Sequence, residues 1–174
     1  MKTLLVDGYN VLRSSDAYAH LTEAMPDHTH DAFNTARQAL IADVATFAGH
    51  DYQATVVFDG AGNPGSTGEP SLEAGITVVF SPAGISADSI IEKLAHRAVE
   101  QGNEVVVVTS DATMQWTILR GKVTRMSAAG FASEMQGIQR EVKEAAERQM
   151  NKRTLGDRLD SKTREALERL AREK

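Results

Sequence analysis

Cysteine is absent from the 174-residue sequence, which also contains no apolar run of membrane-spanning length. The first absence excludes disulfide bonds, zinc sites built on thiolates and cysteine nucleophiles. The second predicts a chain without a membrane-spanning helix and without a membrane partner. The opening segment Met1–Asp7 is too short, and becomes acidic too soon, for a signal peptide. These absences suit a reducing compartment, and we expect a cytoplasmic protein.

Signals for an organic cofactor are also weak. The glycine-rich segment Gly60–Pro70 begins with a G-x-G-x-x-G match after an apolar run, which is the pattern of a dinucleotide-binding loop. That loop must open a helix, and Pro64 with the glycines after it disfavours one. No Lys-Ser or Lys-Thr pair follows to complete a Walker phosphate-binding loop. We therefore expect no organic cofactor and interpret the segment as a loop.

Charge is distributed unevenly along the chain, although its net value of −5 is ordinary. Residues 1–138 contain 8 Lys/Arg and 16 Asp/Glu, whereas residues 139–174 contain 11 Lys/Arg and 8 Asp/Glu. An electrostatic contact with phosphate is therefore expected from the C-terminal part, through Arg148, Lys152, Arg153 and Arg158. A solvated helix with ion pairs among its own side chains explains the same composition equally well.

Short apolar runs rich in β-branched residues predict five strands. They are Lys2–Val6, Ala54–Phe58, Ile76–Phe80, Glu104–Thr109 and, with a weaker pattern, Lys122–Met126. Continuously apolar runs are typical of a parallel sheet that is covered on both faces. Helical patterns lie between the strands, so we expect right-handed β-α-β units and a doubly wound α/β sheet with strand order of about 3-2-1-4-5.

Helices are predicted where apolar residues recur at helical spacing. They are Asp31–Gly49, Ser86–Gly102, Ala112–Arg120, Ser127 to about Met150, and Ser161–Glu173. In the second, Ser86 is the expected N-cap and Gly102 the residue just past the end. Asn151–Asp160 is interpreted as a hinge. The chain is thus expected to form one domain over residues 1–150 and a basic helical extension over residues 151–174.

Four aspartates fall where the predicted sheet would bring them together. Asp7, Asp59 and Asp111 each follow a predicted strand, and Asp88 lies in the first turn of a predicted helix. In open α/β sheets, functional groups gather beyond the carboxyl ends of the strands, where the strand order reverses. With the expected order, Asp7 and Asp111 face each other across that crevice.

Clustered carboxylates repel one another unless a cation neutralises them, and the hard ions that prefer oxygen ligands are Mg²⁺ and Mn²⁺. Such ions activate water and stabilise the charge that develops during attack on a phosphodiester. Each aspartate also has a structural explanation. Asp7-Gly8 and Asp59-Gly60 are turn signals, Asp88 complements a helix dipole, and Asp111 could cap a helix. Four such residues together favour the functional interpretation.

Two further residues could contribute to the same site. Asn10 is a short amide just past the first strand, able to contact a phosphate or a metal-bound water, or else to satisfy backbone groups of a loop. Glu92 lies one helical turn after Asp88 and could reach the same ion. A solvated glutamate on an amphipathic helix is an equally good interpretation.

Several segments resemble the YacP-like NYN-domain ribonucleases of the PIN-like superfamily. They are Val6–Asn10, Val57–Gly60, Ala87–Glu92 and Val108–Asp111, with Gln115, Ser127 and Phe131–Glu134 similar to that family's C-terminal half. The likeness runs from Met1 to about Met150. It departs at Gly60–Pro70, which is glycine-rich where relatives of this type often carry a more basic connection.

The resemblance implies a PIN-like fold in which Asp7, Asp88 and Asp111 bind the metal and Asn10 and Asp59 support them. It also implies an endonuclease of messenger RNA, since family members resemble enzymes of that kind, at least one of which acts only on the ribosome. A metal-dependent endoribonuclease is therefore the expected function. The alternatives are a noncatalytic RNA- or ribosome-binding module and a metal-dependent small-molecule phosphatase. A phosphatase of the haloacid-dehalogenase type would need a second aspartate at Tyr9.

Overall fold

The structure, a computed structural model, describes residues 2–23, 30–60, 66–110 and 122–158. Its elements are β1 (Lys2–Asp7), α1 (Gly8–Ser14), α2 (Asp16–Glu23), α3 (His30–Ala48), β2 (Tyr52–Phe58), β3 (Ser71–Glu73), β4 (Ile76–Phe80), α4 (Ala87–Glu100), β5 (Glu104–Val108), β6 (Val123–Met126) and α5 (Ala128–Arg158). Strands and helices alternate through most of this order, as the α/β prediction requires.

The six strands form one mixed sheet in the order β3-β4-β2-β1-β5-β6. All neighbouring strands are parallel except β3, which pairs antiparallel with β4 at the edge. The predicted strands correspond to β1, β2, β4, β5 and β6, so the predicted order 3-2-1-4-5 is confirmed. The extra strand β3 was not predicted because it is three residues long and its Leu72 is 77% exposed, which leaves no apolar pattern.

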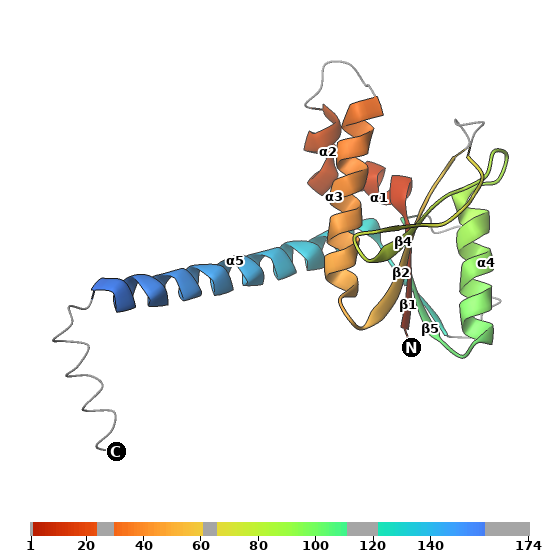
Figure 1. Cartoon of the computed structure of the whole chain (residues 1–174). Coiled ribbons are helices and arrows are strands. Elements are labelled where there is room, and N and C mark those ends of the chain that lie inside the picture. The colour runs from red at the N-terminus through yellow and green to blue at the C-terminus, as the bar shows by residue number, and fades with distance from the viewer. Residues whose placement is uncertain (1, 24–29, 61–65, 111–121, 159–174) are drawn as a thin grey trace. The chain divides into compact units, whose positions relative to one another are not determined.

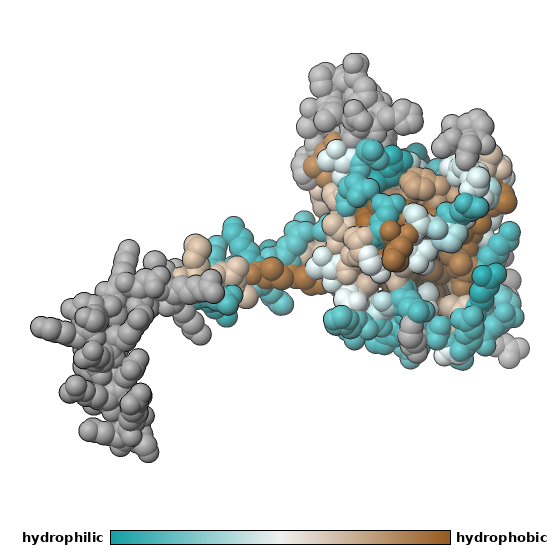
Figure 2. All heavy atoms as spheres, in the orientation of Figure 1, coloured by the Kyte–Doolittle hydropathy of each residue, from teal (hydrophilic) through white to brown (hydrophobic). Residues whose placement is uncertain are grey.

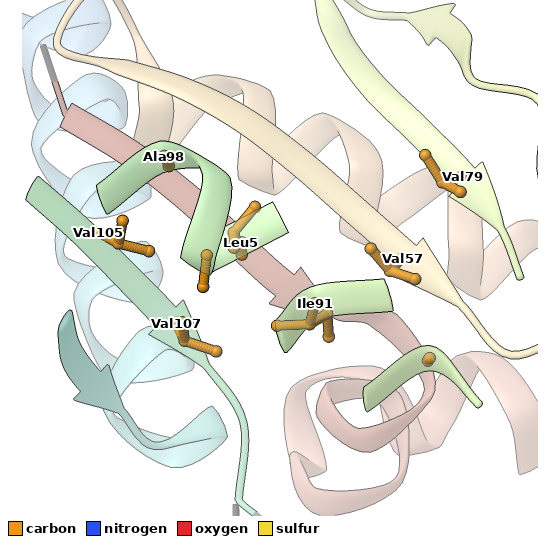
Figure 3. Packing of buried hydrophobic residues seen from close by; sticks show 9 residues of the cluster. Leu5, Val57, Val79, Ile91, Ala98, Val105 and Val107 are labelled. Carbon is orange, nitrogen blue, oxygen red and sulfur yellow. The ribbon is translucent and has the colours of Figure 1, made fainter. Parts of the chain in front are cut away.

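Helices cover both faces of the sheet. α4 lies on one side of the strands and α1 to α3 on the other (Figure 1). Because successive side chains of a strand point to opposite faces, Leu5 of β1 packs toward α4 while Leu4 and Val6 face the other way. Figure 3 shows the α4 side, where Ile91 meets residues of three strands. This buried cluster comprises Leu5, Val57, Val79, Ala87, Ile91, Ala95, Ala98, Val105 and Val107.

The helix patterns were accurate where the amphipathic stripe was long. The predicted Asp31–Gly49 and Ser86–Gly102 correspond to α3 and α4. Ser86 is the N-cap of α4, and its hydroxyl accepts a hydrogen bond from the N–H of Ser89 at 3.2 Å. Gly102 follows the C-cap with φ of +84°, which favours glycine. α1 and α2 were not predicted, since each spans only about two turns, too few for an apolar stripe to repeat.

The predicted hinge was wrong where the structure describes it, because α5 continues without interruption to Arg158. Contacts between backbones divide the chain into two compact units, Met1–Met135 and Gln136–Lys174. Such units need not be domains, so the predicted division at residue 150 stays a prediction. The predicted helices at 112–120 and 161–173 lie outside the described residues.

The two ends of α5 have different environments. At its start Phe131 is buried, and its ring contacts Phe47 of α3 edge to face, with centroids 5.3 Å apart. Farther along, Val142 and Met150 are 61% and 68% exposed, and brown spheres along α5 show such apolar side chains at the surface (Figure 2). No helix in the described part of the chain is long and apolar enough to cross a membrane.

Candidate active site

Asp7 marks the carboxyl end of the central strand. It is the last residue of β1 and the N-cap of α1, and its Oδ1 accepts a hydrogen bond from the N–H of Asn10 at 3.1 Å. The turn expected from Asp7-Gly8 is therefore the start of a helix. Asp7 is only 8% exposed, although an ionised carboxylate is rarely buried without a partner. Its position serves both the cap and the pocket described next.

The pKa of the Asp7 carboxyl is raised to about 6. Burial is the main cause, because removal from water disfavours the charged form. The nearby carboxylates of Asp88 and Asp59 raise the pKa further, while the Asn10 N–H and the Arg13 guanidinium lower it. Three of the four aspartates that the sequence singled out, Asp7, Asp59 and Asp88, therefore interact electrostatically in the folded chain.

A pocket of about 270 Å³ opens at this edge of the sheet. It is lined by Asp7, Tyr9, Asn10, Arg13, Ser14, Asp59, Ala87 and Asp88. Asp59 directly follows β2, and Asp88 lies in the first turn of α4, where the helix dipole favours a negative charge. Three carboxylates, at the ends of two strands and in the first turn of one helix, thus line one pocket, as predicted.

Asn10 connects two neighbouring strand ends. Its backbone N–H binds Asp7, while its side-chain Oδ1 accepts a hydrogen bond of 2.7 Å from the N–H of Ser110, which follows β5. Asn10 lies in the first turn of α1 and not in a loop. Because Ser110 immediately precedes Asp111, this hydrogen bond fixes the backbone that leads into the predicted metal-binding residue.

Replacing Asn10 by Ala should lower the free energy of unfolding by about 1–2 kcal/mol, because the N–H of Ser110 loses its acceptor. Alanine is the better helix former, so the loss cannot be attributed to helix propensity. Chemical denaturation of the purified variant would measure the change. Gln136→Ala is the control, since Gln136 is also an amide in a helix but is exposed. Equal stability of the two variants would contradict a linking role for Asn10.

Asp111 itself lies outside the described residues, so its predicted place opposite Asp7 stays a prediction. Within the described part of the chain, no group of three or more His, Asp or Glu is close enough to hold a metal ion. The oxygen ligands present, Asp7 and Asp88 with Asp59 nearby, are of the kind that Mg²⁺ and Mn²⁺ prefer. The residues present therefore fit such an ion in kind, and binding of a metal ion stays a prediction.

Glu92 does not join this pocket. It is exposed and lines a separate surface depression with Ser89 and His96. Although it lies one turn after Asp88 on the same helix, the second turn of α4 is directed away from the strand ends. Helical spacing alone could not predict the position of Glu92. It shows that Asp88 and Glu92 share a face of the helix, but not which of them reaches the edge of the sheet.

The glycine-rich match after β2 does not open a helix at residues 66–70, which have no regular structure and lead into β3. Gly60 is held instead against the end of β4, because its N–H donates to the hydroxyl of Ser81 at 3.0 Å. The hydroxyl of Ser66 donates to the backbone oxygen of Ser81 at 2.9 Å. The segment so anchored follows Asp59 directly. Residues 61–65 lie outside the described part of the chain.

Sequence reasoning missed the aromatic and arginine residues beside the acids. Tyr9 and Arg13 line the pocket, and the hydroxyl of Tyr9 accepts a hydrogen bond from Arg37 of α3 at 3.0 Å. The spacing of Tyr9, Asn10 and Arg13 on one short helix was the available signal. The sequence contains no signal for Arg37, because it lies 28 positions after Tyr9.

The predicted C-terminal docking residues all lie on α5. Arg148 is exposed and pairs with Glu144 one turn before it at 3.2 Å, as the ion-pair interpretation of this helix expects. The backbone of Lys152, Arg153 and Arg158 is helical, and their side chains are not described. Their contact with phosphate stays a prediction.

Comparisons with known proteins agree with this architecture. The family model described as a YacP-like NYN domain matches residues 4–172. A Bacillus subtilis (strain 168) protein, "Uncharacterized protein YacP", is 30% identical over 142 residues, which are 82% of this chain and 79% of that protein.

Two solved structures are similar in fold and sequence. The crystal structure of Rae1 (YacP) from Bacillus subtilis has a TM-score of 0.66 and 27% identity, and the match covers 98% of this chain and 93% of that one. A tryptophan-to-leucine mutant of the same protein gives a TM-score of 0.65 and 28% identity, with 90% and 89% covered. The sheet topology, the acidic pocket and these matches lead to one conclusion: the chain belongs to the family of YacP-like NYN domains.

Proposed function

We propose that this protein is a metal-dependent endoribonuclease that cleaves phosphodiester bonds of messenger RNA. The observation that carries the proposal is the convergence of Asp7, Asp59 and Asp88 on one pocket at the carboxyl edge of the sheet. Membership of the YacP-like NYN family is consistent with a nuclease-like function related to RNA. A noncatalytic RNA-binding module has no need for three carboxylates in one pocket, because they repel phosphate.

A divalent cation gives these carboxylates a physical reason to be together. The burial and mutual repulsion that raise the pKa of Asp7 are offset when a positive ion is bound between them. We assign Asp7, Asp88 and Asp111 as its ligands and Mg²⁺ or Mn²⁺ as the ion. When bound, such an ion supplies an activated water and neutralises the charge that develops on the phosphate.

Side-chain and backbone groups of the protein hold the proposed metal ligands in position. The N–H of Asn10 orients the Asp7 carboxylate, and the side chain of Asn10 holds the backbone of Ser110. Asp59 is the third carboxylate on the wall of the pocket and is assigned a supporting role. Groups held in this way need little rearrangement before reaction, which is a major source of catalytic rate.

The direct test is cleavage of RNA by the purified protein. Incubated with Mn²⁺, the full chain should produce internal cuts in a messenger RNA transcript and leave a nucleoside monophosphate intact. Chelation of the ion by EDTA should stop the cleavage. Release of phosphate from the monophosphate would support the phosphatase alternative, and binding of RNA without cleavage, with or without ribosomes, would support the noncatalytic one.

Divalent ions should also raise the melting temperature, because a ligand that binds only the folded state stabilises it by mass action. At 100 times the dissociation constant the gain is about 2.7 kcal/mol. Thermal unfolding with Mn²⁺ or with EDTA measures the effect. The gain should be lost in Asp7→Asn and kept in Asp16→Asn, which changes an exposed aspartate of α2. An equal gain in all three proteins would indicate non-specific ion binding.

The C-terminal part is proposed as the element that docks on RNA or on the ribosome, through Arg148, Lys152, Arg153 and Arg158. Removal of residues 151–174 should then weaken binding and flatten its salt dependence, by roughly 0.7 log units per lost contact per log unit of salt on single strands. The metal-induced gain in melting temperature should remain. An unchanged salt slope together with a lower melting temperature would show that this segment only stabilises the fold.

A further inference from the structure

Two arginines stand beside the acidic pocket in a part of the chain that is otherwise rich in acids. Arg13 lines the pocket, and its guanidinium lies 5.8 Å from the centroid of the Tyr9 ring. Arg37, on α3, lies with its guanidinium 5.5 Å from the centroid of the Phe80 ring, at the end of β4. Tyr9 and Phe80 each contact Phe58, so one aromatic cluster supports both cations.

Among the described residues, no carboxylate pairs with Arg37. Its Nη1 donates to the hydroxyl of Tyr9 at 3.0 Å, and its Nη2 donates to Oδ1 of Asn34 at 2.8 Å. Among the described residues, these bonds use two of its five N–H groups and leave three for a ligand. The ion pairs found among described residues are His96–Glu100 and Arg148–Glu144, which involve neither Arg13 nor Arg37.

A positive charge of this kind suits a phosphate that lies near the acidic pocket. The carboxylates alone repel a polyanion, so a substrate strand needs cations beside the reacting phosphate. Arginine binds phosphate through its planar fork, and an arginine already fixed by packing loses little freedom when it binds. The pocket volume of about 270 Å³ is small and suits one linkage of a single strand more than a duplex.

We propose that Arg37 and Arg13, supported by Tyr9, bind backbone phosphates of single-stranded RNA next to the phosphate that enters the acidic pocket. This inference rests on the proposed nuclease function and assigns its substrate path. The strand runs from the three aspartates past Tyr9 and Arg13 toward Arg37 and Phe80. Unpaired bases stack well on aromatic rings and guanidinium planes, which makes such a path tolerant of sequence.

Binding can be tested apart from catalysis. A fluorescein-labelled oligouridylate is titrated with the full-length protein in EDTA, and fluorescence anisotropy is followed between about 50 and 200 mM salt. Arg37→Gln and Arg13→Gln should each weaken binding several-fold and lower the salt slope by about 0.7. Arg97→Gln is the matched control, because Arg97 is an exposed arginine of α4 that lines a different pocket.

The melting temperature of each variant separates recognition from packing. If Arg37→Gln lowers the melting temperature but leaves affinity and salt slope unchanged, Arg37 only packs on Phe80 and the proposal is overturned. The proposal is also overturned if Arg97→Gln weakens binding as much as the other two variants do. Arg37→Lys keeps the charge but not the fork, so its affinity should fall between those of the wild type and Arg37→Gln.

Failure of the nuclease proposal would look different. If the wild-type protein binds the oligonucleotide through these arginines but does not cut RNA with Mn²⁺, the binding path is supported and the catalytic function is contradicted. If the wild-type protein cuts RNA but both arginine variants bind it with unchanged affinity and salt slope, the nuclease function is supported and the binding path is contradicted.

Discussion

Asp7→Asn and Asp88→Asn should each reduce RNA cleavage by on the order of 100-fold or more, because an amide cannot supply the negative charge that holds a divalent cation. Both variants should fold. Asparagine is as good an N-cap as aspartate, so the hydrogen bond from the N–H of Asn10 can be kept at position 7. Initial rates of cleavage of one transcript, with Mn²⁺ in excess, would measure the effect. Asp111→Asn should behave in the same way.

Asp16→Asn is the control for this series, because it removes one negative charge from an exposed position in the first turn of α2. Its cleavage rate should equal that of the wild type. If two of the three site variants retained wild-type activity, the assignment of the metal-binding acids would be wrong. If Asp16→Asn were as inactive as they are, the assay would be reporting net charge and not the site.

Asp7→Asn should also stabilise the metal-free protein at neutral pH. The pKa of Asp7 rises from 3.8 to about 6 on folding, and each unit corresponds to 1.36 kcal/mol. A carboxyl whose pKa is raised by folding carries no penalty below about pH 4, where it is protonated in both states. The penalty grows as the pH rises and reaches on the order of 3 kcal/mol above pH 6, once both states are ionised.

Measuring the free energy of unfolding in EDTA at pH 4.5 and at pH 7.5 tests the direction of this pH dependence. Asp7→Asn should be the more stable protein at pH 7.5, and its advantage over the wild type should shrink toward pH 4.5. Asp16→Asn should show no such pH-dependent advantage. An advantage of Asp7→Asn that grows toward acid would contradict the stated direction of the shift.

Gly60→Ala should lower the free energy of unfolding by about 3 kcal/mol, which is near the upper end for overpacking. A Cβ at Gly60 would lie 2.1 Å from the backbone oxygen of Ser81 and 2.7 Å from the hydroxyl of Ser66. A backbone atom at the end of β4 cannot turn aside as a flexible side chain can. The end of β2, and Asp59 with it, would have to move, so cleavage should fall as well.

Gly137→Ala is the matched substitution without a clash. Gly137 lies inside α5, and a Cβ there meets nothing within 4 Å. Alanine should leave stability unchanged or raise it by up to about 1 kcal/mol, because glycine is the poorer helix former. Chemical denaturation of both variants gives the comparison. Equal stability of Gly60→Ala and the wild type would mean that the ends of β2 and β4 can separate at little cost.

The sequence alone predicted the order of five strands of the sheet, the helices α3 and α4, and the part of α5 up to about Met150. Runs such as Val105–Val108 are short, β-branched and apolar on both faces, which leaves little choice but a central strand. In α3 and α4 the apolar residues repeat over enough turns to identify the helical period. Such signals are local, and they become reliable when many neighbouring residues repeat them. The elements α1, α2 and β3 are too short to repeat a pattern.

The convergence of Asp7, Asp59 and Asp88 was also predictable, because parallel strands and the helices that follow them share one edge of the sheet. The hinge after residue 150 was predicted wrongly. A segment with a glycine and several polar residues can stay helical to Arg158, since each turn adds its own backbone hydrogen bonds to a helix already formed.

Only the tertiary structure decided how the pocket is completed. The hydrogen bond between Asn10 and Ser110 joins residues 100 positions apart, and that between Arg37 and Tyr9 joins residues 28 apart. No periodicity encodes such pairs, because they depend on the distance and angle at which α1 and α3 pack on the sheet. The sequence by itself predicted that Asp7, Asp59 and Asp88 lie at one edge of the sheet. Packing determined which amide and which cations stand beside them, since a side chain's partners are fixed only when separate elements come into contact.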